Sequence, residues 1–197
     1  MSPSQDDSLR SLLMEEVELA KAGDSEAFTQ LFEHYHTGIY GYIAGLVNNV
    51  EDAQDLTQKT FLKAWEKLPD LRDTSKFKPW LYTIARNLVY DHRRQKKKIF
   101  WESWERISGL DILVSEFSHE EEIAEAQLVR LVLVEVPVRY RSCLLLQVEG
   151  GFSQHEIAEL LGISKASVST YLSIARARFR QAYRRLASEQ DTTVKRR

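Results

Sequence analysis

The chain has 197 residues, of which 43% are hydrophobic, so it can build one large packed domain or two small ones. No stretch approaches the roughly 20 consecutive apolar residues that span a bilayer, and the chain begins with acidic residues rather than the basic ones of a signal peptide. We therefore expect a cytoplasmic protein without membrane insertion. Because Cys143 is the only cysteine and the histidines are scattered, we also expect no internal disulfide, no metal site and no cofactor.

Charge is distributed in alternating blocks, which the formal net charge of −2 conceals. Residues 1–70 carry 5 basic and 13 acidic side chains, whereas residues 71–98 carry 9 and 2. Residues 99–136 are acidic again, with 2 and 9, and residues 137–197 are basic, with 11 and 5. The basic blocks predict two contacts with polyanions, and the acidic blocks predict surfaces that avoid nucleic acid or bind basic protein.

The expected elements are all helices, because apolar residues recur at helical spacing and no alternating strand pattern is present. Asp24 or Ser25 can cap a first amphipathic helix. A second helix is expected over about residues 52–68, with one apolar and one polar face. After a loop, Pro79 suits the first turn of a third helix, which runs into the basic tract at residues 91–98.

Residues 99–118 show no clear period, and we interpret them as a flexible linker. Ser118 and Glu121 then form the S-x-x-E pattern of a capping box, which predicts a helix to about residue 134. Pro137 begins the next helix, which two glycines end. The fold class is therefore all-α, with two helical domains at residues 10–98 and 119–188 on either side of the linker at residues 99–118.

Two helices around a tight turn follow in the second domain. Ser153 and Glu156 predict a capping box for the first, Gly162 ends it, and Ser164 caps a long last helix. This spacing predicts a helix-turn-helix whose second helix lies in a DNA major groove. Its outward face carries mostly small hydroxyl side chains, which discriminate poorly between bases. An ordinary helical hairpin with a glycine turn remains an alternative reading of this stretch alone.

Aromatic and basic residues are interleaved between residues 72 and 98. This combination suits single-stranded nucleic acid, because cations follow the backbone while rings stack on unpaired bases. At helical spacing, however, Trp80 can equally be a core residue. Beside a helix-turn-helix, the pattern predicts a protein that holds both duplex and opened DNA.

Three stretches resemble the conserved parts of an extracytoplasmic-function (ECF) sigma factor, within the RNA polymerase sigma factor family. They are DAQDLTQKTFLKAW, FKPWLYTIARNLVYDHRR and the helix-turn-helix stretch that begins VPVRYRSCLLLQVEGGFSQHEIAELLGISK. The resemblance covers roughly residues 20–98 and 120–187. It implies a region 2 helical bundle and a region 4 helix-turn-helix in an alternative sigma factor. Such a protein is not an enzyme; it binds core RNA polymerase, directs it to promoters and helps to open the minus-ten DNA.

The resemblance also implies site residues, which fall into three groups. The polymerase-binding group, facing the β′ clamp, is Asp52, Asp55, Gln58 and Lys59. The minus-ten group is Lys76, Phe77, Trp80, Arg86, Asn87, Asp91, Arg93 and Arg94. The minus-thirty-five group is Ser164, Lys165, Ala166, Ser167, Ser169, Thr170, Ser173 and Arg176. Further implied partners are the β flap of polymerase and an anti-sigma factor, and the linker, with Trp101 and Trp104, is expected to thread the polymerase channel.

The chain departs from the family pattern at a few positions. Lys59 stands where glutamate is common, and Ser169 and Ile174 stand where arginine or another polar reader is common. Two other functions remain open: a helix-turn-helix regulator with a ligand-binding amino-terminal domain, and a sigma-like decoy that binds an anti-sigma protein. A nucleic-acid enzyme is disfavoured, because no carboxylate cluster or metal-ligand spacing accompanies the basic stretches.

Overall fold

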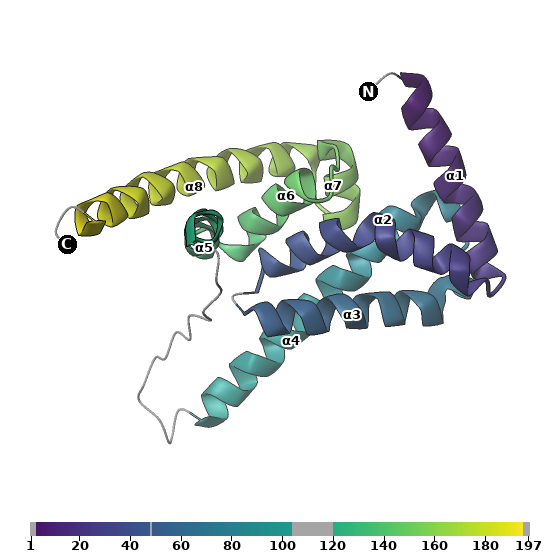
Figure 1. The fold of residues 1–197 in the computed structure, drawn as a ribbon, viewed down its shortest axis with the longest axis horizontal. Helices are drawn as coiled ribbons and strands as arrows, with labels where there is room; N and C mark the ends of the chain where they lie inside the picture. Colours follow the sequence, from purple (N-terminus) through teal and green to yellow (C-terminus); the bar gives the residue numbers. More distant parts are fainter. Residues whose placement is uncertain (1–2, 48, 104–119, 195–197) are drawn as a thin grey trace.

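The computed structural model describes residues 3–47, 49–103 and 120–194, and every regular element in these ranges is a helix (Figure 1). The all-α prediction is confirmed. The first unit contains α1 (Pro3–Lys21), α2 (Ser25–Ala44), α3 (Val50–Lys67), the 3-10 turns η1 (Leu68–Asp70) and η2 (Thr74–Lys76), and α4 (Phe77–Ser103). The second unit contains α5 (Glu120–Glu135), α6 (Val138–Val148), α7 (Gln154–Leu161) and α8 (Lys165–Val194).

Two features of the first unit differ from the sequence expectation. Helix α1 precedes the helix that was expected to be first, and it buries Val17 and Ala20 against the core. Helix α4 continues to Ser103, so residues 99–103 are helical rather than part of a linker. No proline or glycine interrupts the chain there, so nothing in the sequence ends the helix. Trp104 and Ser118, with the rest of residues 104–119, lie outside the described residues.

Side-chain caps fix several helix ends. Asp24 accepts hydrogen bonds from the backbone nitrogens of Glu26 and Ala27, at 2.8 and 3.1 Å, which selects it over Ser25 as the cap of α2. The expected capping box at α7 is present, with Ser153 as the cap. Gly162 ends α7 at a φ of 66°, a left-handed conformation that glycine adopts without a steric penalty.

The core of the first unit lies between α2, α3 and α4. Leu31 and Ile43 from α2 are fully buried, as are Ala64 from α3 and Leu81 and Ala85 from α4. In the second unit α8 packs along both α5 and α6, and α7 crosses its beginning. The helix-turn-helix is therefore held on a separate small scaffold.

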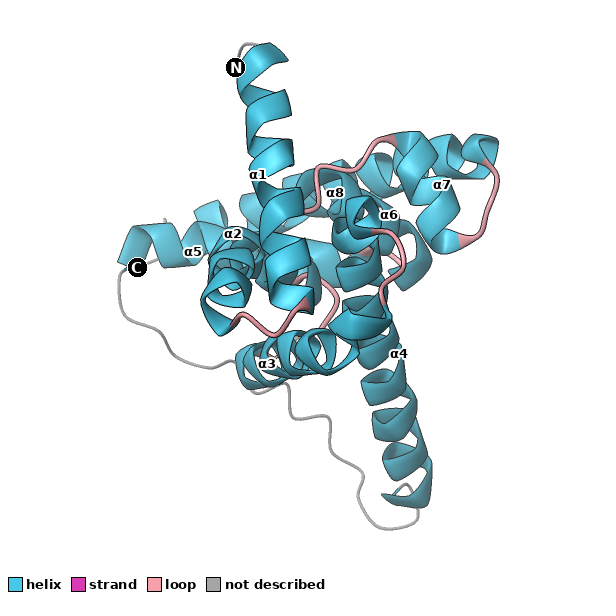
Figure 2. Ribbon diagram, turned by 90° about the vertical axis from the view of Figure 1, so that its right-hand side faces the viewer, coloured by secondary structure: helices cyan, strands magenta, loops and turns pink. Residues whose placement is uncertain are grey.

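The two units are not independent bodies. Helix α6 lies against α2, and α7 lies against α4 (Figures 1 and 2). One continuous group of buried residues includes Tyr42 of α2 and Tyr82 of α4 together with Leu145 of α6 and Phe152 of the α6–α7 loop. This arrangement places candidate DNA-contacting residues of the first unit beside the second.

Candidate functional site

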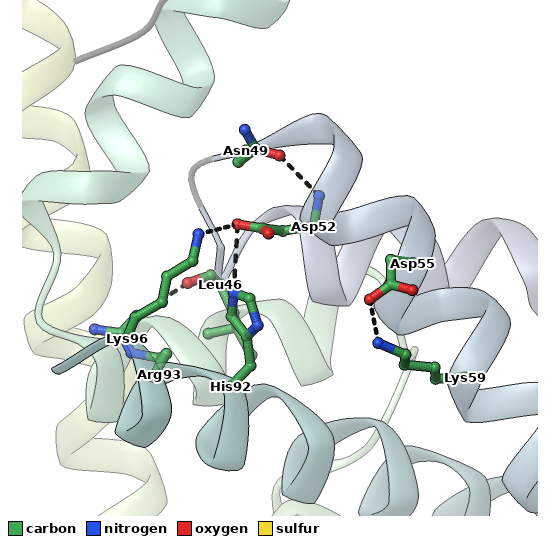
Figure 3. Close-up of polar contacts among 8 residues, drawn as sticks. All are labelled: Leu46, Asn49, Asp52, Asp55, Lys59, His92, Arg93 and Lys96. Carbon is green, nitrogen blue, oxygen red and sulfur yellow. Dashed lines mark hydrogen bonds and ion pairs between the residues drawn. The ribbon is translucent and has the colours of Figure 1, made fainter. Parts of the chain in front are cut away.

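Helix α3 presents two acidic side chains with different surroundings (Figure 3). The Oδ2 atom of Asp52 lies 2.5 Å from Lys96 Nζ and 3.3 Å from His92 Nε2, both on α4. The side chain of Asn49 accepts a hydrogen bond from the Asp52 backbone nitrogen at 2.7 Å. Asp52 therefore joins the beginning of α3 to the basic part of α4.

The electrostatic surroundings of Asp52 favour its charged form. Burial alone would raise its pKa, but the hydrogen bond from Lys96 and the positive charges at His92 and Lys96 outweigh that effect. The pKa of this carboxyl is therefore held below its ordinary value. A carboxylate engaged in this way has less capacity to bind an external partner than a free one.

The outward face of α3 is exposed and mixed in character. Asp55 and Lys59 form an ion pair at 2.6 Å, one helical turn apart, and Gln58 is exposed beside them. Leu62 continues this face with a side chain that is 56% exposed. An exposed leucine next to alternating charges is typical of a protein-docking surface. Sequence reasoning missed Leu62, although an apolar residue on an otherwise polar helix face was a usable signal.

Helix α4 has two polar faces, and only one of them is open to solvent. Asn87, Asp91 and Arg94 are exposed at helical spacing, and Arg94 lies 3.8 Å from Asp91. Arg86 and Arg93 instead turn inward and donate hydrogen bonds to backbone oxygens. Arg86 Nη1 donates to the Leu160 oxygen at 2.8 Å, and Arg93 Nη1 donates to the Leu46 oxygen at 3.0 Å. The structure therefore divides the sequence-predicted minus-ten group between two surfaces.

The beginning of α4 brings Phe77 and Trp80 together, with ring centroids 5.8 Å apart, but they differ in exposure. Phe77 is only 2% exposed and also contacts Tyr35, at 5.5 Å between ring centroids. Trp80 is half-buried, and Lys76 beside it is exposed. In this arrangement Phe77 is a core residue that cannot stack on a base, whereas Trp80 still offers part of its ring.

A cleft of about 990 Å³ lies between the two units at this position. Its lining contrasts in charge: Lys76 and Lys78 come from the first unit, and Glu149, Glu156 and Glu159 come from the second. Lys78 Nζ also lies 4.7 Å from the centroid of the Phe152 ring. Burial lowers the pKa of Lys78, and the nearby charge of Glu156 partly opposes that shift. The cleft combines cations, carboxylates and aromatic rings within one interface.

The start of α8 exposes the residues expected to read DNA, but several of their hydroxyls are already engaged. Ser164 and Ser167 share a hydrogen bond at 2.8 Å, and the hydroxyl of Thr170 donates to the Ala166 oxygen at 3.0 Å. Among the described residues, Ser169 and Ser173 have no such partner, and both are exposed together with Lys165. Further along, Arg176 Nη2 donates to Gln147 at 2.6 Å. This geometry makes Ser169 the hydroxyl best placed to contact a base.

Comparison with known proteins identifies these two units. The models of Sigma-70 region 2 and Sigma-70, region 4 match residues 31–99 and 126–179. The ECF RNA polymerase sigma factor SigM of Bacillus subtilis (strain 168) is 30% identical over 157 residues, which cover 79% of this chain and 94% of that protein. RNA polymerase sigma factor SigZ of the same organism is 33% identical over 154 residues, covering 77% and 84%. The chain belongs to the family of ECF RNA polymerase sigma factors.

Solved structures agree with this sigma factor fold. The sigma factor RpoE in complex with the anti-sigma factor NepR from Bartonella quintana superposes with a TM-score of 0.66 at 24% identity, over 80% of this chain and 96% of that one. CnrH in complex with the cytosolic domain of CnrY gives the same TM-score and identity, over 86% and 96%. The protein is thus an alternative sigma factor, which acts in transcription initiation with RNA polymerase at promoters.

Region 2 of this sigma factor is α1–α4, and region 4 is α5–α8. The match to region 2 replaces the alternative of a ligand-binding amino-terminal domain in an ordinary helix-turn-helix regulator. None of the helices in the described ranges is long and apolar enough to cross a membrane.

Proposed function

We propose that this sigma factor docks on the β′ clamp of core polymerase through the outward face of α3. The support is the exposed combination of Asp55, Gln58, Lys59 and Leu62 on one surface. Asp52, which sequence reasoning placed in the same group, has a mainly internal role in this proposal because Lys96 and His92 hold it. The Asp55–Lys59 ion pair is exposed, so a partner displaces it at little free-energy cost.

The minus-ten element is assigned to α4 and the turn before it. Lys76, Asn87 and Arg94 are exposed and suit an opened strand, and the half-buried Trp80 supplies a stacking surface for an unpaired base. Arg86 and Arg93 join this surface once they leave their present backbone partners. Extracting a base from the duplex costs a few kcal/mol, which stacking and phosphate contacts offset.

The minus-thirty-five element is assigned to the beginning of α8. Lys165 contributes the positive charge at the first turn, and Ser169 and Ser173 contribute free hydroxyls. Weak base contacts suffice because polymerase holds both regions on one promoter, which raises the effective concentration of each contact. We further propose the β flap and an anti-sigma factor as partners of region 4, and the polymerase channel as the path of the linker.

Transcription in vitro with core polymerase and a random promoter library tests this function. A sigma factor directs initiation from a subset of the library, whereas a decoy for an anti-sigma protein gives no transcript. Recovered promoters should share two elements, one opened and one duplex. A transcribing protein that needs no minus-ten element would contradict the assignment of α4.

Charge reversal tests the docking face. Asp55→Arg should weaken core binding about tenfold or more, because a like-charge contact replaces a favourable one at the interface. The matched control is Asp70→Arg, an equally exposed aspartate in η1 away from this face. Equal core affinity for the two variants, measured by fluorescence anisotropy, would remove α3 from the docking surface.

A further inference from the structure

Helix α2 carries glycines at positions 38 and 41 and ends at Gly45, all on the side that meets region 4. Glycine is unfavourable inside a helix, so two of them within one helix need a compensating contact. The sequence TGIYGYIAG contains no turn that would explain them, since the described backbone of α2 is helical throughout. Their function therefore has to come from what approaches the helix.

Region 4 approaches α2 more closely than a side chain would permit. A Cβ atom at position 41 would lie 2.4 Å from Oε2 and 2.8 Å from Cδ of Glu149. A Cβ atom at position 45 would lie 2.6 and 2.7 Å from the two Cδ atoms of Leu145. At position 38 it would lie 3.0 Å from the Glu149 backbone oxygen. Helix α6 thus nests in a glycine-lined face of α2.

Polar contacts cross the same interface. Tyr42 Oη and Ser142 Oγ are buried and hydrogen-bonded at 3.0 Å. Tyr82 Oη donates to the Glu149 backbone oxygen at 3.3 Å. Buried, paired polar groups specify one relative placement of two surfaces, because any other placement leaves them unsatisfied.

The closed arrangement occupies cations that our proposed function gives to promoter DNA. Arg86 donates to the Leu160 oxygen of α7, and Lys78 lies over the Phe152 ring beside Glu156. We propose that the free sigma factor closes region 4 onto region 2 through the glycine-lined face of α2, and that this closure is autoinhibitory. The inhibitory part rests on the proposed function of α4, whereas the closure itself does not.

The closed interface also contains an element that favours its release. Arg141 of α6 is 4% exposed, and its only described hydrogen bond is from Nη1 to the Gly45 oxygen at 3.3 Å. Its Nε has no partner, and no carboxylate pairs with it among the residues that the structure describes. A buried guanidinium without a counter-charge opposes closure. Polymerase binding then has only a modest closing free energy to overcome.

Scattering of the free protein tests the closure. Gly41→Leu and Gly45→Leu place side chains where only region 4 atoms lie, so each should open the molecule and increase its radius of gyration in small-angle X-ray scattering. Gln30→Leu, on an exposed part of α2, is the matched control and should scatter as the wild type does. Unchanged far-UV circular dichroism excludes unfolding. Wild-type dimensions in both glycine variants would overturn the proposal.

A reversible crosslink tests the inhibition. A Cβ atom at position 41 would lie 3.3 Å from Glu149 Cγ, so Gly41→Cys with Glu149→Cys brings two thiols within disulfide reach. The native Cys143 is fully buried and its pKa is raised to about 11 by burial, so it should not compete. The oxidised double variant should lose promoter-specific transcription, and reductant should restore it. Each single-cysteine variant controls for the oxidant.

Two further outcomes separate the closure from the function of α4. Full transcription by the oxidised double variant would overturn autoinhibition. Arg86→Ala in the opened Gly41→Leu background should reduce open-complex formation about tenfold if Arg86 contacts DNA. If it does not, the DNA assignment of Arg86 fails, and with it the occlusion of that residue, while the scattering result on closure stands.

Discussion

Arg141 shows how one side chain can set the balance between two arrangements. Burial lowers its pKa to about 10, with the charge of Arg93 acting in the same direction, so its charged form is disfavoured where it lies. Replacing a buried, unpaired charge by an apolar side chain of similar length removes that penalty.

Arg141→Met should therefore stabilise the closed protein. We expect the midpoint of thermal unfolding to rise by about 2–4 °C for each kcal/mol gained in a chain of this size. Transcription at limiting core polymerase should fall in parallel. Arg139→Met, an exposed neighbour that lies over Tyr140, is the matched control. A lower midpoint for Arg141→Met would mean that the guanidinium contributes more through its Gly45 contact than it costs by burial.

Phe77 and Trp80 should separate stability from DNA opening. Phe77→Ala removes a buried ring, so it should lower the free energy of unfolding by about 3–5 kcal/mol in chemical denaturation. Trp80→Ala should destabilise less and should reduce permanganate reactivity at the minus-ten element. A promoter with a pre-opened bubble should recover part of the Trp80→Ala loss. Normal footprints for Trp80→Ala would leave that ring a structural role only.

At the scale of elements, α3 and α4 are joined by Asp52 with Lys96 and His92. Because the pKa of Asp52 is depressed in the folded protein, its contribution to stability is present above its ordinary pKa of 3.8 and is lost as pH falls through the lower folded value. The contribution should be no more than about 1 kcal/mol, since the groups are partly solvated.

The test is Asp52→Asn against pH. At pH 7 the variant should unfold at a lower temperature than the wild type, and the difference should disappear below about pH 3. Asp91→Asn, whose carboxylate is exposed and 3.8 Å from Arg94, should show no such difference. A gap between Asp52→Asn and wild type that persists in acid would indicate a role other than charge.

The first turns of α8 carry a prediction about specificity. Ser169→Arg should shift the preferred minus-thirty-five sequence toward a guanine, because arginine contacts guanine through two hydrogen bonds worth about 1–3 kcal/mol. Thr170→Arg is the comparison, since Thr170 bonds back to its own helix. Selection of promoter variants with each holoenzyme measures the shift. The same preferred sequence for Ser169→Arg and wild type would mean that Ser169 does not face the bases.

Sequence patterns predicted those elements that local chemistry determines. The capping box at Ser153 and the left-handed end at Gly162 are encoded within a few residues, and both are confirmed. Helix α1 was missed because its acidic, weakly periodic sequence resembles a solvated tail until α2 covers Val17. The end of α4 was missed because a basic tract was taken as a boundary, although it contains no helix breaker.

At the scale of the whole molecule, the sequence predicted two units but not their contact. Contacts such as Tyr42 with Ser142 join residues far apart in the chain, and no local period encodes them. The burial of Phe77 and the inward turn of Arg86 follow from that same packing, so their site roles were also beyond sequence reasoning. The glycines of α2 were the one available signal, because their position inside a helix called for an explanation.

The shared core predicts how the molecule unfolds. Buried residues of both regions form one continuous group, so the wild type should give a single cooperative calorimetric transition. Gly41→Leu should divide that transition into two, one for each region. Two transitions already present in the wild type would mean that the regions are energetically independent.

The length of α4 has a mechanical consequence. Its 27 residues form one uninterrupted helix, about 40 Å long, from Phe77 to Ser103 (Figure 1). Such a rod moves as a lever, since a tilt at one end sweeps the other through a proportionate arc. Any adjustment where a base meets Trp80 is therefore delivered, without an intervening joint, to the place where the chain departs for region 4.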